Sequence, residues 1–186
     1  MQCDAQAKLY YLYMMADGEV SSNEKNLFSS ICKKLNLDSY DKKNIIRACE
    51  IVTKDEGLTC MEVVKKNVEE GIFMYGYSDI DLNKWEIDQE KMSVLWNLIN
   101  LGYADTYFSS EEREVVEYIK EYWEISDSLY KEMIDVAETC LSLEKDKKWV
   151  ESLPESDFKS EKLKKIKKDL KYVQKTIKTT ISEVEF

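Results

Sequence analysis

The chain has 186 residues, of which 44% are hydrophobic, and it carries a net charge of −10 at neutral pH. This length and apolar content suffice for one compact domain with an appendage. One proline and five glycines supply few of the tight turns of an all-β protein, which favours an all-α fold. The absence of histidine removes the usual general base at neutral pH and the commonest transition-metal ligand, which argues against an enzyme.

Neither the apolar runs nor the cysteines indicate a membrane-spanning or disulfide-bonded protein. The longest apolar stretch, residues 9–16, is too short to cross a bilayer, and no signal-peptide pattern opens the chain. The five cysteines are odd in number, scattered and without CxxC spacing. We therefore expect a cytoplasmic protein with buried free thiols.

Start and stop signals predict four helices in the first half of the chain. Gly18 can take the left-handed conformation that ends the first helix. Ser21 and Glu24 match a capping box, in which each side chain accepts a hydrogen bond from the other residue's backbone amide. The predicted helices cover residues 3–16, a segment that starts at residue 21, residues 38–53 and residues 59–68.

The first of these helices is expected to bury one face. Leu9, Leu12, Tyr13 and Ala16 share that face, so the aromatic residues on it are interpreted as core. Tyr10 and Tyr11 are neighbours in sequence, and we expect that they do not both point inward.

The second half repeats the plan of the first. We expect an ordered connection over residues 71–86, followed by helices over 88–103, from the Ser109 capping box to 124, and from 126 or 127 to 143. Residues 1–144 would then form one domain with halves at about 3–70 and 87–144. An alternative for part of the connection is a calcium-binding loop over 79–90, with acids or Asn at loop positions 1, 3, 5 and 12. Lys84 and Glu86 depart from that loop pattern, and the other interpretation is a solvated segment that caps the next helix.

The charge changes sign near the end of the chain. Residues 1–144 hold 15 Lys and Arg against 29 Asp and Glu, whereas residues 145–186 hold 12 against 8. This basic extension is predicted to contain an amphipathic helix over 159–178. Its apolar stripe can pack on the chain's own acidic domain, lie on an anionic membrane surface, or pair with a partner helix. Nucleic acid is disfavoured as a partner because the body is acidic and the extension has no Arg. The apolar stripe consists of Leu163, Ile166, Leu170, Val173 and Ile177.

One pattern occurs twice, 88 positions apart. Residues 16–24 read ADGEVSSNE and residues 104–112 read ADTYFSSEE, and the apolar positions of the helix that follows also coincide. The two halves are therefore predicted to share one fold unit. Each unit places an Asp and a Glu seven residues apart, so a two-fold arrangement could bring four carboxylates together.

This duplicated pattern, within an acidic all-α chain, resembles the TerB tellurite-resistance family and the TerB-like domains of other bacterial proteins. The resemblance covers roughly residues 5–143, and the second copy has Thr106 and Tyr107 where the first has Gly and Glu. It implies a pseudo-symmetric bundle of about seven helices, a link to stress responses, no established catalytic activity, and a metal site made of motif acids. Carried over position by position, those acids are Asp17, Glu24, Asp105 and Glu112.

The residues themselves leave two interpretations of this site open. Glu24 and Glu112 are fully explained as partners in capping boxes. Asp17 and Asp105 follow helix C-termini, where the helix dipole disfavours an anion, so each is either part of an Asx turn or a ligand. If the four carboxylates converge, their repulsion calls for a hard divalent cation, Ca²⁺ or Mg²⁺.

Together these features predict a non-enzymatic, TerB-like adaptor in a stress response. It would present an acidic surface and a divalent cation to a partner protein, with peripheral membrane contact through the basic helix as a further expectation. The alternative function is an acidic immunity or inhibitor protein that neutralises a basic partner such as a toxin. Neighbouring genes would separate the two, because a toxin gene favours immunity and tellurium-resistance genes favour the stress response.

Overall fold

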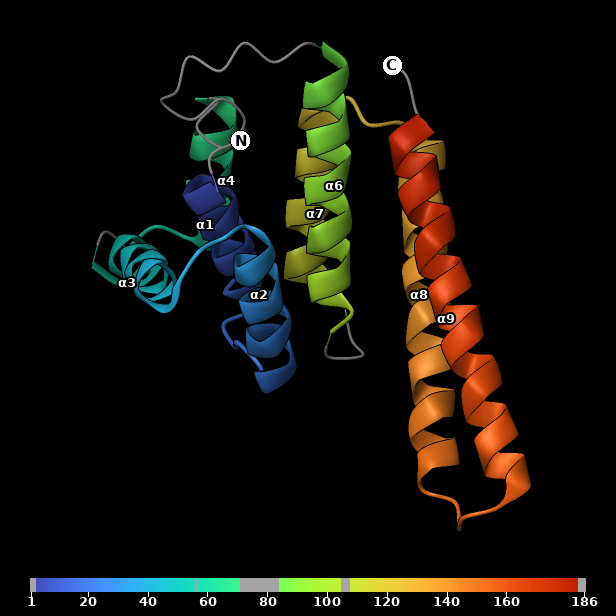
Figure 1. Ribbon diagram of the computed structural model, residues 1–186. Helices are drawn as coiled ribbons and strands as arrows, with labels where there is room; N and C mark the ends of the chain where they lie inside the picture. The colour runs from blue at the N-terminus through green and yellow to red at the C-terminus, as the bar shows by residue number, and fades with distance from the viewer. Residues whose placement is uncertain (1–2, 56, 71–83, 105–107, 184–186) are drawn as a thin grey trace. The chain divides into compact units, whose positions relative to one another are not determined.

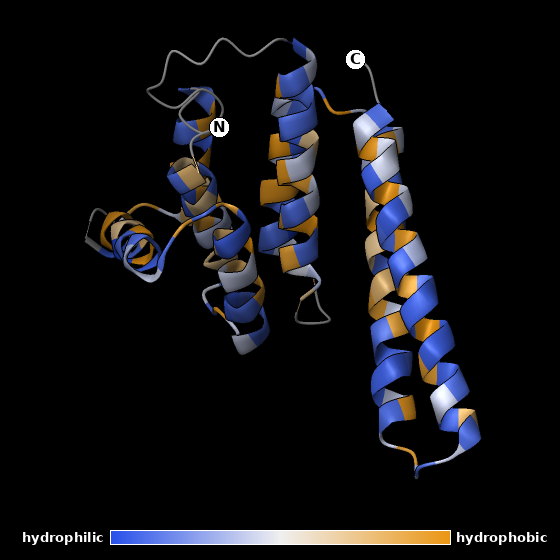
Figure 2. Ribbon diagram, in the orientation of Figure 1, coloured by the Kyte–Doolittle hydropathy of each residue, from blue (hydrophilic) through white to orange (hydrophobic). Residues whose placement is uncertain are grey.

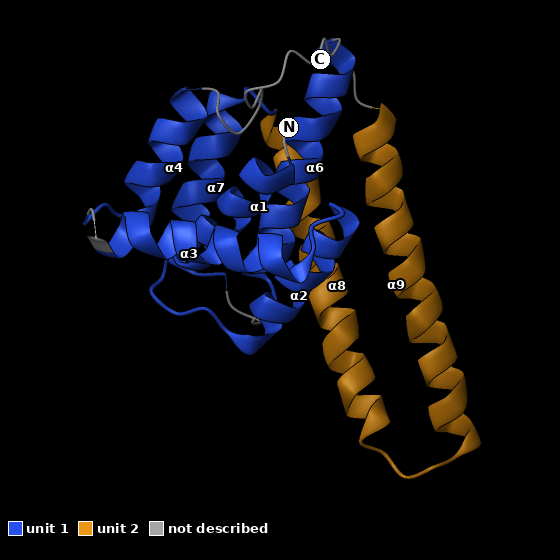
Figure 3. Ribbon diagram, turned by 60° about the vertical axis from the view of Figure 1, so that its left-hand side comes forward, with its two compact units in different colours: residues 1–125 blue, residues 126–186 orange. Residues whose placement is uncertain are grey.

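The computed structural model describes residues 3–55, 57–70, 84–104 and 108–183. These residues form eight α-helices and no strand, which confirms the all-α prediction (Figure 1). The chain divides into two compact units, residues 1–125 and 126–186 (Figure 3). The sequence places its boundary later, at the change of charge after residue 144. None of the helices described is both long enough and apolar enough to cross a bilayer.

The first unit is built around its first helix. Helix α1 packs against each of the other five helices described in this unit (Figure 1). Within this unit most helix boundaries lie within two residues of the predicted ones, and the largest difference is at the start of α6, which begins four residues earlier than predicted. The helices are α1 (Cys3–Met14), α2 (Ser22–Lys34), α3 (Ser39–Asp55), α4 (Cys60–Glu69), α6 (Lys84–Gly102) and α7 (Ser110–Tyr122).

The expectation that Tyr10 and Tyr11 do not both point inward is wrong. Tyr10 is fully buried and Tyr11 is 6% exposed. The phenol of Tyr10 accepts a hydrogen bond from Asn97 Nδ2 at 3.0 Å, and the ring of Tyr11 lies 5.6 Å from that of Phe28. A helix covered on all sides has no exposed face to which one of two adjacent aromatic residues must turn.

Local structure repeats between α2 and α7. Both helices are 13 residues long, and both begin with a complete Ser/Glu capping box. Beyond their C-termini, Asn36 and Glu124 adopt left-handed conformations with φ of 58° and 57°. The next residues, Leu37 and Ile125, donate their N–H groups to carbonyls five residues earlier, at 2.9 and 3.0 Å, as in Schellman motifs. Helices α2 and α7 therefore share the geometry of both their ends, while the internal repeat and a two-fold relation between the halves stay predictions.

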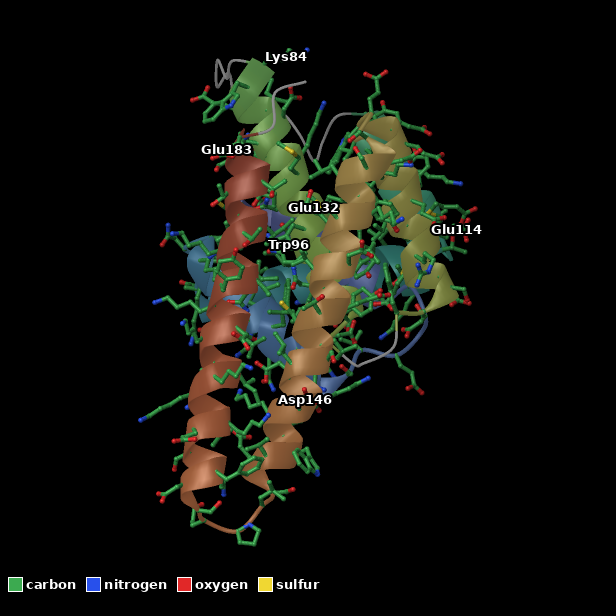
Figure 4. The ribbon with its side chains drawn as sticks, turned by 90° about the vertical axis from the view of Figure 1, so that its right-hand side faces the viewer. Lys84, Trp96, Glu114, Glu132, Asp146 and Glu183 are labelled. Carbon is green, nitrogen blue, oxygen red and sulfur yellow. The ribbon has the colours of Figure 1, made fainter. Side chains whose placement is uncertain are left out.

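The second unit is a hairpin of α8 (Asp127–Glu151) and α9 (Asp157–Glu183). Helix α8 runs eight residues beyond its predicted end, so the change of charge falls inside a helix. Val150 of α8 forms a small core with Ile166 and Leu170 of α9, and apolar segments recur along both helices (Figure 2). The apolar stripe of α9 therefore packs on α8. Farther along, Thr180 donates a hydrogen bond to Glu132, which is labelled in Figure 4, at 3.0 Å.

A second row of residues on α9 is entirely basic. Its members are exposed and recur at spacings of three and four, so they share one helix face. Each like-charged pair at such a spacing destabilises a helix by about 0.2–0.5 kcal/mol at low salt. We call this row the lysine stripe, and it consists of Lys164, Lys167, Lys168, Lys171, Lys175 and Lys178.

All five cysteines are free thiols, as expected from their odd number and scattered spacing in the sequence. Cys32 and Cys49 are buried as expected, and burial raises the pKa of the Cys49 thiol to about 12. Cys60 and Cys140 are half-buried, and Cys3 is exposed.

Gly102, the last residue of α6, lies where no side chain fits. A Cβ atom there would meet Tyr13 Oη of α1 and would lie 2.7 Å from Cδ2 of Phe108. The Phe108 ring is itself held against Tyr103, with ring centroids 5.2 Å apart. The close approach of α6 to α1 at this end therefore depends on glycine.

We expect Gly102→Ala to lower the free energy of unfolding by about 1–3 kcal/mol, because the added methyl overpacks this contact. Alanine normally stabilises a helix relative to glycine by roughly 0.5–1 kcal/mol. The predicted change in the free energy of unfolding therefore has the opposite sign to the change that helix propensity alone would give. Urea denaturation measures the change. Ser93→Ala, on the exposed face of α6, is the control and should stay within about 0.5 kcal/mol of the wild type. A Gly102→Ala protein as stable as the wild type would contradict the close contact.

Candidate functional site

The start of α2 holds the first predicted glutamate. Ser21 donates its backbone N–H to Glu24 Oε2 at 2.8 Å, and Glu24 returns its N–H to Ser21 Oγ at 3.1 Å. The first turn of α2 thus places the carboxylate beside the helix N-terminus, where the dipole favours an anion. Glu24 is nevertheless only 4% exposed, so the same carboxylate is also largely removed from water.

The start of α7 holds the corresponding glutamate in the same arrangement. Glu112 Oε2 accepts hydrogen bonds from the backbone N–H and the hydroxyl of Ser109, at 3.0 and 2.9 Å, and the Glu112 N–H donates to Ser109 Oγ at 3.1 Å. Glu112 is also 4% exposed. The other carboxylate oxygen, Oε1, takes part in none of these three capping hydrogen bonds.

Burial is not a requirement of the capping box itself. Helix α4 begins with a third box, from Thr59 to Glu62, which the sequence interpretation did not single out. There the Glu62 carboxylate accepts from the Thr59 N–H and hydroxyl, both at 2.8 Å, and the side chain is exposed. These hydrogen bonds lower the pKa of Glu62. Glu24 and Glu112 therefore differ from an ordinary cap partner in being buried.

Asp17 lies in the turn between α1 and α2. Its Oδ1 accepts the N–H of Glu19 at 3.0 Å, which is an Asx turn, and the next residue, Gly18, has the predicted left-handed φ of 88°. The Asx-turn interpretation of Asp17 is confirmed. The side chain is exposed, and its second oxygen is not the acceptor of this bond.

The pKa of Glu112 responds to the charges of two other predicted acids. Burial raises the pKa of Glu112 to about 7, against the lowering effect of its hydrogen bonds from Ser109. The negative charges of Glu24 and Asp17 raise this pKa further. Charges from the first copy of the motif thus act on Glu112 of the second copy, although 88 positions separate the two copies in sequence. The fourth acid, Asp105, lies outside the residues that the structure describes.

The chemistry of this arrangement follows from its charge. Near neutral pH the Glu112 carboxyl is about half protonated, and further loss of its proton is opposed by the neighbouring carboxylates. A proton and a hard cation can each relieve that repulsion, and carboxylate oxygens suit Ca²⁺ or Mg²⁺. Within the described part of the chain, however, no three acidic or thiol side chains form a complete metal-binding cluster.

The alternative calcium loop over 79–90 does not fit the structure. Residues 84–90 form the first turns of α6, so loop positions 6–12 are helical rather than wrapped around an ion. Residues 79–83 lie outside the described part of the chain.

An aromatic contact between α4 and α7 was missed from the sequence. Tyr118 donates a hydrogen bond to Glu69 Oε1 at 3.1 Å, Lys65 Nζ lies 5.3 Å from the Tyr118 ring centre, and Tyr122 stacks at 6.1 Å. Burial, followed by the hydrogen bond and charge of Glu69, raises the pKa of Tyr118 to about 12. The spacing of the two tyrosines by four residues was the available signal. This contact ties the first half of the unit to the second.

Comparison with known proteins identifies one family. The family model described as "Tellurite resistance protein TerB" matches residues 4–134. No match was found among curated proteins or among solved structures.

The raised pKa of Glu112 predicts a specific dependence of stability on pH. A carboxyl whose pKa is higher in the folded state than in the unfolded state stabilises the fold below its unfolded pKa, and this contribution is lost as the pH rises through about 7. Between about pH 5 and pH 8 the wild type should therefore lose of order 1–2 kcal/mol of unfolding free energy relative to Glu112→Gln, after allowance for solvent screening. Denaturant unfolding of both proteins across this range measures the difference.

Glu62→Gln is the matched control, because it makes the same change in an exposed capping box. The pKa of Glu62 is lowered, so its contribution to stability is present above the unfolded pKa and is lost as the pH falls. Glu62→Gln should therefore be less stable than the wild type at neutral pH, with the difference vanishing in acid. The same pH dependence in both variants would show that Glu112 is an ordinary cap.

Proposed function

The chain belongs to the TerB tellurite-resistance family, and on this premise we propose that it is a non-enzymatic adaptor that binds a divalent cation and a partner protein. One observation carries the proposal: Glu112 is buried, and its pKa is raised to about 7 by burial and by the charges of Glu24 and Asp17. An adaptor rather than an enzyme is supported by the lack of any histidine for proton transfer or nucleophile activation.

The proposed cation site needs Asp105, the fourth acid of the sequence repeat, in addition to Asp17, Glu24 and Glu112, because the three described acids alone form no metal-binding cluster. Glu112 uses Oε2 for capping, and its Oε1 is the candidate ligand. Backbone carbonyls or water would supply the remaining ligands, as is common for Ca²⁺ and Mg²⁺. A cation here would offset the repulsion among the carboxylates and would compete with the proton on Glu112.

The proposed partner surface is the acidic outer face of α7. Exposed glutamates recur there at spacings of three and four, on the side opposite the buried Val115 and Ile119. The first unit as a whole holds 14 Lys and Arg against 24 Asp and Glu, a net charge of −10. A basic protein surface is the complement, and the charge would speed association. The face consists of Glu114 (labelled in Figure 4), Glu117 and Glu121, and Glu124 follows just beyond the end of the helix.

The same face also supports the second candidate, an inhibitor that neutralises a basic toxin. An inhibitor of this kind needs only charge and shape, so its binding would not depend on a cation. An adaptor whose cation site shapes the unit would bind its partner differently with and without the ion. A toxin gene beside this one would favour the inhibitor, and tellurium-resistance genes would favour the adaptor.

Calorimetric titration of the metal-stripped protein with Ca²⁺ and then Mg²⁺ tests the cation site. We expect saturable binding near one equivalent, and a stabilisation of about 2.7 kcal/mol when the free ion is at a hundred times its Kd. Because the ion displaces a proton from Glu112, more protons should be released at about pH 6 than at pH 8. Asp17→Asn with Asp105→Asn should abolish both effects without unfolding the protein.

Glu114→Gln with Glu117→Gln is the charge-matched control for this titration. It also removes two acids from the first unit, but from its exposed outer face. Binding that is retained in this control and lost in the Asp17, Asp105 variant would support the site. No binding by the wild type, or equal binding by both variants, would leave the motif as helix capping.

A further inference from the structure

The lysine stripe is a continuous basic face on α9. Its six members span 15 residues, with about 21 Å of helix between the first and the last, and occupy an arc of roughly 100°. Between Ser160 and Ser182 that arc contains no acidic residue. A helix of this length could separate the lysines with glutamates, so the uninterrupted row of like charges stands out.

The stripe lysines have no charged partners within the described residues. No ion pair or hydrogen bond of their side chains is found there, although lysines elsewhere on α9 do make contacts. Lys159 pairs with Glu155 at 2.6 Å, and Lys162 Nζ lies 5.8 Å from the Phe158 ring centre. The six ammonium groups of the stripe therefore repel one another without an internal counter-charge, a local cost that an external anion would offset.

The apolar face of α9 is already occupied. Ile166 and Leu170 are buried in the core of the α8–α9 hairpin, with Leu163 packed against them. Helix α9 therefore cannot insert that face into a membrane or a partner groove while the hairpin is intact. Any binding through the lysine stripe, on the other side of α9, therefore has to be electrostatic, and the helix stays at the surface of what it binds.

The chemistry of the stripe favours a diffuse array of negative charges. Helix α9 has nine lysines and no arginine, so the planar, bidentate recognition of single carboxylates or phosphates is absent. Lysine is a hydrated point charge, which suits many loosely placed phosphates. Tyr172, beside the stripe, is 71% exposed, and Trp149 and Phe158 are exposed on either side of the turn between α8 and α9. Lysines with exposed aromatic rings are typical of helices that lie at membrane surfaces.

We propose that the lysine stripe binds the surface of a bilayer that contains anionic phospholipids, with α9 lying on the headgroups and not inserted. Clusters of four to eight lysines on one helix are typical of such binding. At 0.1 M salt the screening length is about 10 Å, so the charges that act on the headgroups are chiefly those of the residues nearest to them. This surface is separate from the carboxylate site, so either can fail without the other.

Co-sedimentation of the full chain with vesicles tests the proposal. The vesicles are phosphatidylcholine with or without about 30% phosphatidylglycerol, at about 50 mM salt. The wild type should bind the anionic vesicles and not the neutral ones, and about 300 mM salt should release it. Each lysine near such a surface is worth roughly fivefold in affinity, so Lys164→Gln, Lys168→Gln, Lys171→Gln and Lys175→Gln together should weaken binding by more than about thirtyfold.

The matched control replaces four exposed lysines of the first unit, with Lys25→Gln, Lys33→Gln, Lys34→Gln and Lys43→Gln. It carries the same net charge as the stripe variant and should bind anionic vesicles within about threefold of the wild type. A melting scan checks folding, and the stripe variant should melt no lower than the wild type because repulsion along α9 is relieved. If that variant does not fold, Lys167→Gln with Lys178→Gln should still show an intermediate loss.

Four outcomes would overturn the proposal. They are no binding of the wild type to anionic vesicles at low salt, equal binding to neutral vesicles, unchanged binding of the stripe variant, and binding that persists at high salt. A parallel titration with a 20-base-pair DNA duplex tests nucleic acid, which is the other source of clustered phosphates. Stripe-dependent binding to the duplex without binding to vesicles would identify nucleic acid as the ligand and would also overturn it.

Discussion

Burial of α1 on every side is the constraint on which the first unit depends. Helices α2, α3, α4, α6 and α7 all pack against it, so its small and aromatic residues set how closely the others approach. At one end Gly102 lets α6 approach Tyr13, and in the middle Asn97 satisfies the buried phenol of Tyr10. Because tightly packed interiors tolerate little change in volume, the relative placement of α2 and α7 follows from these contacts. Those two helices carry the buried glutamates.

The two buried glutamates are held by opposing effects. Capping hydrogen bonds and the helix dipole favour the charged form at the start of α2 and of α7, whereas burial and mutual repulsion favour the neutral form of Glu112. In the exposed box of α4 the hydrogen bonds dominate, and the pKa of Glu62 is lowered. The same capping motif therefore holds a carboxyl with a lowered pKa at the start of α4 and a carboxyl with a pKa near 7 at the start of α7. Solvent exposure and neighbouring acids make the difference.

Charge is distributed differently in the two units. The first unit is acidic overall, and the exposed glutamates of α7 concentrate part of that charge on one face. The second unit holds 13 basic and 13 acidic residues, yet nine of its lysines lie on α9. Because the apolar stripe of α9 packs on α8, its basic side remains available to solvent. An acidic unit is thus joined in this chain to a hairpin with a basic face.

Features that form within a few residues were predictable from the sequence. The Ser/Glu boxes at residues 21 and 109, the left-handed Gly18 and the all-α class depend on hydrogen bonds and periodicities that neighbouring residues determine. Tertiary structure alone decided that Tyr10 and Tyr11 are both buried, that α8 continues through the change of charge, and that Glu112 has a raised pKa. These properties depend on groups distant in sequence, since desolvation and Coulomb interactions act through space and not along the chain. The sequence could therefore name the acids of the candidate site, but it could not say which of them the fold removes from water.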